Sequence, residues 1–185
     1  FNMHFQLFPL QILFINLITD VLPALALGVT EGSGDVMKHA QRNMNEPIID
    51  RKRWISIFVY YSILGLVSLG AVLFSHYTHN TTAWEPELGN NILFFTLIFA
   101  QLLHVLNMGE HGIFYRRSEV LRSRYVWLAV LLSVSIVILC YAITPVRHVL
   151  SLQEMSMSNW LVCSGAALVS LILIGLVRKF RMVKN

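Results

Sequence analysis

The strongest constraint on the fold is a series of five apolar stretches, each close to the length that a helix needs to cross a lipid bilayer. A transmembrane helix takes about 20 mainly apolar residues. None of the stretches alternates apolar and polar residues, as a membrane β-strand does. We therefore predict an all-α, polytopic membrane protein, a five-helix transmembrane bundle with spans at residues 7–28, 54–75, 92–109, 125–144 and 159–177.

The composition agrees with this class of protein. Of the 185 residues, 56% are hydrophobic and 13% are charged, and the mean hydropathy is +0.62. Soluble domains average about 45–50% apolar and about 25% charged residues, and disordered chains are less hydrophobic still. The composition therefore excludes a water-soluble globular domain and a disordered chain.

The distribution of basic residues predicts the orientation. Thirteen of the 14 Lys and Arg residues lie in the loops 29–53 and 110–124 or in the C-terminal tail, and the other is Arg147. Because loops rich in Lys and Arg stay in the cytosol, these loops are expected to be cytosolic, with the N-terminus outside and the C-terminus inside. The basic residues thus flank a lipid bilayer, and no nucleic-acid partner is expected.

The chain begins at Phe1 and carries no basic leader before its first apolar stretch. A secretory signal peptide has positive charge before its apolar core. We therefore expect these residues to be the C-terminal part of a longer protein. Asn80 begins an Asn-Thr-Thr glycosylation triplet on the side predicted to be outside.

The candidate site lies in the first span. Asn16, Thr19, Asp20 and Pro23 stand at positions i, i+3, i+4 and i+7, which share one face of an α-helix. Pro23 has no N–H group, so the carbonyl of Thr19 loses its usual donor. Broken helices at membrane depth are tolerated where they line a cavity or an ion site, and an acid within the membrane is a functional candidate.

Amide, hydroxyl and carboxylate oxygens suit a hard cation such as Ca²⁺, whereas zinc and soft metals prefer His, Cys or Met. We predict that Asn16, Thr19 and Asp20 contribute metal ligands. The alternative is a polar contact between helices in which Asp20 is protonated or paired. A second polar stripe in the third span contains Gln101, a possible weak contributor, and His104, for which a packing role is favoured.

Residues 9–28, PLQILFINLITDVLPALALG, resemble the sixth transmembrane helix of calcium-transporting P-type ATPases, including the sarcoplasmic-reticulum-type pumps. Residues 35–37, Arg42 and residues 46–49 are similar to the cytosolic loop that follows that helix in the family. The resemblance extends over the five spans, as expected for helices six to ten of a ten-helix pump. It implies an ATP-driven cation pump in which Asn16, Thr19 and Asp20 fall where the family ligates Ca²⁺.

The resemblance also implies partners and substrates. Upstream transmembrane helices and a cytosolic phosphorylation domain of the same parent chain would complete the pump, and ATP and Mg²⁺ would act only through those missing domains. The secretory-pathway branch, which also carries Mn²⁺, has Gln where this chain has Leu25. The eighth helix of the sarcoplasmic-reticulum type supplies a glutamate to one of two Ca²⁺ sites. Gln101 falls at its place, which predicts one ion per ATP.

The parent protein is thus expected to be an enzyme, whereas residues 1–185 alone are not. The alternative hypothesis is a standalone five-helix membrane protein without catalysis, acting as a subunit, a passive channel or a remnant of a pump.

Overall fold

The computed structural model describes residues 7–29, 51–78, 86–108 and 119–183, and all regular structure in these ranges is helical. The predicted all-α fold with five spans is confirmed, because five helices are long and apolar enough to cross a membrane: Pro9–Val29, Arg53–Thr78, Pro86–Asn107, Arg124–Ala142 and Met157–Lys179. Most of the loops 29–53 and 110–124, the N-terminal end and Asn80 lie outside the described residues. The orientation therefore stays a prediction.

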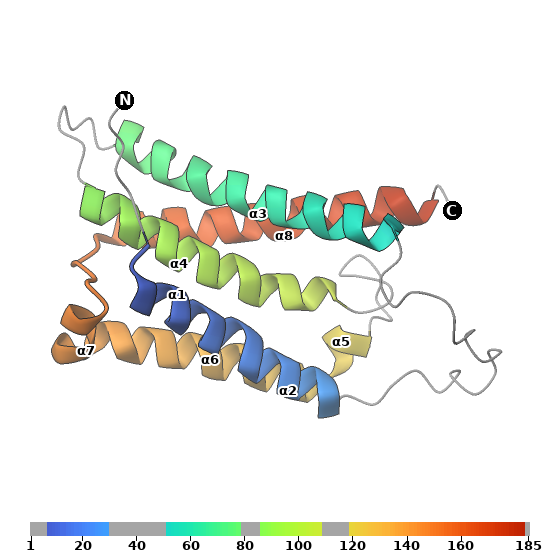
Figure 1. Cartoon of the computed structure of the whole chain (residues 1–185), viewed down its shortest axis with the longest axis horizontal. Coiled ribbons are helices and arrows are strands. Elements are labelled where there is room, and N and C mark those ends of the chain that lie inside the picture. Colours follow the sequence, from blue (N-terminus) through green and yellow to red (C-terminus); the bar gives the residue numbers. More distant parts are fainter. Residues whose placement is uncertain (1–6, 30–50, 79–85, 109–118, 184–185) are drawn as a thin grey trace.

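Helix α4 (Pro86–His104) forms the centre of the bundle. Helices α3 (Arg51–Thr78) and α8 (Met157–Val183) pack on one side of it. The first span and α6 (Arg124–Ala142) lie on the other side (Figure 1). In its most apolar stretch α4 has 61% of its residues buried, against 22–28% in the other four spans. This helix therefore contributes more buried side chains to the core than any other described helix.

The side chains of α4 explain its central position. Phe94, Phe95 and Ile98 are almost fully buried, and the ring of Phe95 lies 4.7 Å from that of Trp160 in α8. Further along, Ala100 has no exposed surface and allows α3 and α8 to approach α4 closely. Lipid tails are as apolar as these side chains, so close packing, rather than removal from water, holds the helices together.

Helix α4 begins six residues before the predicted span 92–109. Pro86 occupies its first position, where a missing N–H group has no cost. The early start brings Asn90 and Asn91 into the helix, and both are buried. Asn90 and Asn91, which the sequence placed in a loop before the span, are therefore part of the helical bundle.

Gln11 ties the first span to the rest of the bundle at this end. Its Oε1 accepts hydrogen bonds from the backbone N–H of Phe8 at 3.0 Å and from Nδ2 of Asn90 at 3.2 Å. Its Nε2 donates to the carbonyl of Leu150 at 2.9 Å, in the turn after the short helix α7 (Thr144–Val149). Gln11 is fully buried, so these bonds satisfy a polar group that would otherwise be costly to bury.

Candidate ion-binding site

The first span is interrupted in its middle. It consists of α1 (Pro9–Asn16), a π-helical segment η1 (Leu17–Val21) and α2 (Leu22–Val29). Pro23 is the second residue of α2 and lacks the N–H group that an α-helix would offer to the carbonyl of Thr19. Short π-helical turns inside α-helices occur frequently at functional sites. The interruption contains two of the three predicted ligand residues and directly follows the third.

The four polar positions do not all face the same way. Thr19 and Pro23 are buried toward the bundle, whereas Asn16 and Asp20 are exposed. The expectation of one shared face assumed 3.6 residues per turn throughout, and a π-helical turn holds more residues than that. Within the described residues, Asn16 and Asp20 therefore lie on an uncovered surface, with Thr19 at its inner edge.

Thr19 is held in place by its own helix. Its Oγ1 donates a hydrogen bond to the carbonyl of Ile15 at 2.9 Å and lies 3.4 Å from Oδ1 of Asp20. A hydroxyl that donates its single hydrogen keeps lone pairs available for another group. Thr19 and Asp20 thus bring two side-chain oxygens close together at the π-helical turn.

Helix α6 supports the same turn from inside the bundle. Oγ of Ser133 donates a hydrogen bond to the carbonyl of Ile18 at 3.3 Å, and both residues are buried. A carbonyl in an interrupted helix needs such a donor, since no water reaches it in the membrane. The sequence offered no sign of this role, because Ser133 lies in an apolar run of ordinary appearance.

Gln101 is partly buried in α4, which packs against η1. In the described part of the chain, no hydrogen bond joins Gln101 to Asn16, Thr19 or Asp20. His104 packs its ring edge-on to Tyr60 of α3, with the ring centres 5.8 Å apart. The hydrogen bond expected for a packing histidine is not seen at its buried Nδ1 among the described residues. Among these described ranges there is also no group of three or more His, Cys, Asp or Glu side chains that could hold a metal ion.

The chain resembles known proteins over almost all of its length. Residues 5–180 match the family described as "Cation transporting ATPase, C-terminus". The chain is 29% identical to a calcium-transporting ATPase of Lactococcus lactis over 94% of its residues, and 29% identical to one of Bacillus subtilis over 86%. A probable calcium-transporting ATPase of Trypanosoma brucei is 35% identical over 43% of the chain.

The matched region is a minor part of these relatives. It spans 19% of the Lactococcus protein, 17% of the Bacillus protein and 8% of the Trypanosoma protein. The family match and the five membrane-spanning helices together identify an integral, multi-pass membrane protein. The chain therefore belongs to the cation transporting ATPase family, of which it is a C-terminal membrane region.

Proposed function

We propose that this chain is the membrane part of an ATP-driven cation pump with Ca²⁺ as the transported ion, and that Asn16, Thr19 and Asp20 contribute ligands to the ion. The observation that carries the proposal is the exposed carboxylate of Asp20 at the π-helical turn of an otherwise apolar span. Placing an unpaired acid at the membrane centre costs about 2.5–3.5 kcal/mol on a biological insertion scale. A bound cation would offset this cost.

The ligand chemistry supports Ca²⁺. Three side-chain oxygens from one helix are fewer than the roughly six to eight that Ca²⁺ takes, so other helices of the parent protein must supply the remainder. The uncovered surface that bears Asn16 and Asp20 would receive those helices. The same oxygen ligands suit Mn²⁺, and the relatives that we compared are named for calcium transport.

The chemistry of ATP would take place elsewhere in the parent. The resemblance implies a phosphorylated aspartate and a nucleotide domain in the cytosol, with ATP and Mg²⁺ bound there. The role of these 185 residues is then to bind the cation in a way that depends on the state of that domain.

The test is the variant Asp20→Asn in the complete protein. Asparagine keeps an oxygen and the shape of the side chain but removes the charge, so Ca²⁺-dependent phosphorylation from ATP should fall at least about a hundredfold. The protein should still fold, because the side chain of Asp20 is exposed and its one polar neighbour within the described residues is Oγ1 of Thr19, at 3.4 Å.

Glu154→Gln is the matched control, since it removes an exposed carboxylate that lies between α7 and α8 and pairs with Arg147 rather than with a residue of the π-helical turn. It should leave phosphorylation unchanged. If Asp20→Asn still forms a near-normal amount of Ca²⁺-dependent phosphoenzyme, Asp20 is not an ion ligand. The alternative, in which Asp20 makes a polar contact between helices, would then remain.

A further inference from the structure

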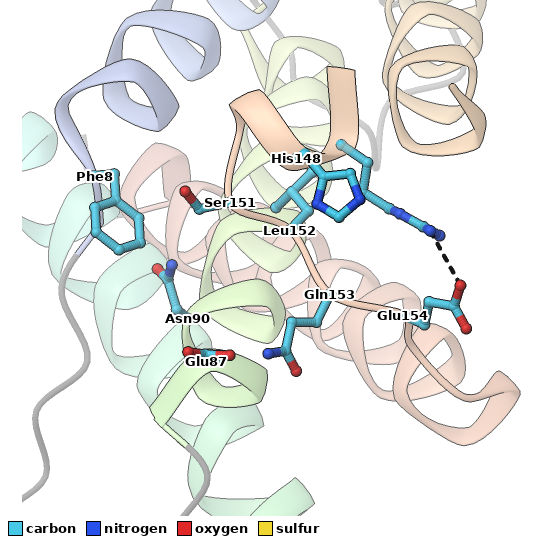
Figure 2. A pocket seen from close by; sticks show the side chains of 9 residues that line it. Phe8, Glu87, Asn90, His148, Ser151, Leu152, Gln153 and Glu154 are labelled. Carbon is cyan, nitrogen blue, oxygen red and sulfur yellow. Dashed lines mark hydrogen bonds and ion pairs between the residues drawn. The ribbon is translucent and has the colours of Figure 1, made fainter. Parts of the chain in front are cut away.

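A cavity of about 540 Å³ opens at the end of the bundle where α1 and α4 begin. The first turns of α4 form one wall, and α7 with the loop that follows it forms the other (Figure 2). None of the predicted ligands of the transported ion lines this cavity. It is therefore a different site.

The α4 wall offers hydrogen-bond acceptors. Asn90 is only 4% exposed and points between Phe8 and Ser151 (Figure 2). Its Nδ2 is bonded to Gln11, but its Oδ1 receives no hydrogen bond from any described residue. Glu87 lies one turn earlier on the same wall. Five buried side-chain polar atoms in the described ranges lack a partner, and Oδ1 of Asn90 is the one among them whose residue lines this cavity. A ligand with N–H groups and a positive charge would supply the missing donor.

The opposite wall is basic. Arg147 and His148 come from the last turn of α7. Nη2 of Arg147 lies 3.1 Å from Oε1 of Glu154, whose side chain is 81% exposed. The side chain of Arg147 itself is 19% exposed. A guanidinium has five N–H donors, so Arg147 can bind an anion in addition to Glu154. The ring of Tyr141, 5.7 Å from the guanidinium, helps to hold it in place.

The surroundings of the cavity indicate where such a ligand comes from. Val149 of α7 is 66% exposed, Phe8 is 48% exposed, and both lie beside the charged residues at the end of the membrane-spanning helices. Short helices that present apolar and basic side chains together lie at the membrane surface, at the level of the lipid headgroups. A bare metal cation fits poorly, because the Arg147 guanidinium would repel it and the cavity is too large for close coordination.

We propose that this cavity binds the phosphoethanolamine headgroup of a membrane lipid. The ammonium group donates hydrogen bonds to Oδ1 of Asn90 and to the carboxylate of Glu87, while the phosphate accepts hydrogen bonds from Arg147 and His148. The proposal rests on the membrane location of the chain and is independent of which cation the parent protein carries.

The choline headgroup provides a sharp test, since its trimethylammonium has the same charge but no N–H group. The complete protein is purified from micelles that contain equal amounts of phosphatidylethanolamine and phosphatidylcholine with identical acyl chains, and the retained lipids are counted by mass spectrometry. We expect phosphatidylethanolamine to be retained about tenfold over phosphatidylcholine. Glu87→Gln should remove most of this preference, and Arg147→Gln should lower the retention of both lipids.

Arg124→Gln is the matched control, because it removes an exposed arginine at the opposite end of the bundle and should change neither lipid. All three side chains are at least partly exposed, and equal melting temperatures of the variants will establish that they fold. Equal retention of the two lipids by the unaltered protein would overturn the proposal, as would a preference that survives both cavity variants. If an equimolar amount of soluble glycerophosphoethanolamine displaces the retained phosphatidylethanolamine, the cavity does not require a lipid, and that part of the proposal would be overturned.

Discussion

At the scale of single residues, the turn at residues 17–21 is held by side chains from two helices. Thr19 bonds within its own helix, and Ser133 donates to the carbonyl of Ile18 from α6. Only the residues of the first span could be predicted from the sequence, since their spacing and the single acid stand out against an apolar background. The role of Ser133 could not be predicted, because its hydrogen-bond partner Ile18 is 115 positions away along the chain.

The bond from Ser133 gives the first prediction at this scale. Ser133→Ala leaves the buried carbonyl of Ile18 without its donor and should lower the free energy of unfolding by about 1 kcal/mol. It should also weaken Ca²⁺ binding, because the π-helical turn loses a support. The measurements are the melting temperature and the Ca²⁺ dependence of phosphorylation in the complete protein.

Ser135→Ala is the control for this variant. Ser135 lies two residues further along α6, is exposed, and bonds only to the carbonyl of Leu131 in its own helix. If both variants behave alike, Ser133 has no special connection with the first span.

Gln101 gives the second prediction at this scale. A glutamine at the place of a glutamate keeps an oxygen but removes a negative charge, and in a site of low dielectric this weakens the attraction for a dication strongly. We expect one Ca²⁺ bound per phosphorylation site, measured with ⁴⁵Ca²⁺ at equilibrium. A protein that binds two ions cooperatively per site would refute this, whereas a ratio near one, with transport retained in Gln101→Glu, agrees with it.

At the scale of helices, the five spans followed from hydropathy, but their places in the bundle and the short helices α5 (Glu119–Arg122) and α7 did not. Five apolar stretches predict five spans, whatever their arrangement. The central position of α4 depends on which side chains fill the space between helices, such as Phe95 and Ala100. The early start of α4 was missed for a related reason. Asn90 and Asn91 are polar, and the acceptors of their Nδ2 groups, on Gln11 and Gln153, are distant in the sequence.

The packing around α4 leads to a prediction for this scale. Ala100→Leu adds a bulky side chain between α3, α4 and α8, where Ala100 has no exposed surface, and overpacking of this kind costs about 1–3 kcal/mol. The complete protein should melt at a lower temperature. Ala142→Leu makes the same change at an exposed position at the end of α6 and should have little effect. Equal melting temperatures of the two variants would contradict a tightly packed centre.

At the scale of the whole molecule, the proposed ion site is incomplete within this chain. Asn16 and Asp20 lie on a surface that no described residue covers, and three oxygens do not satisfy Ca²⁺. We therefore expect residues 1–185 alone to bind Ca²⁺ with a dissociation constant above about 1 mM and to hydrolyse no ATP. Isothermal calorimetry of the purified chain, with the complete protein as the positive control, measures this. Micromolar binding that Asp20→Asn abolishes would show that the chain forms the site by itself.

The two halves of the first span are attached to different parts of the bundle. Gln11 fastens the beginning of α1 to Asn90 of α4 and to the turn after α7, whereas α2 packs mainly against α6. The π-helical turn η1 lies between these attachments and is where the helix is least regular. The two halves of the first span are thus held by different neighbours, and the π-helical turn is the hinge between them. In the proposed pump we expect α2 to rotate together with α6 about this turn while α1 stays fixed. The proposed ion ligands would then lie at the point of rotation, where a small change of angle alters their spacing most directly.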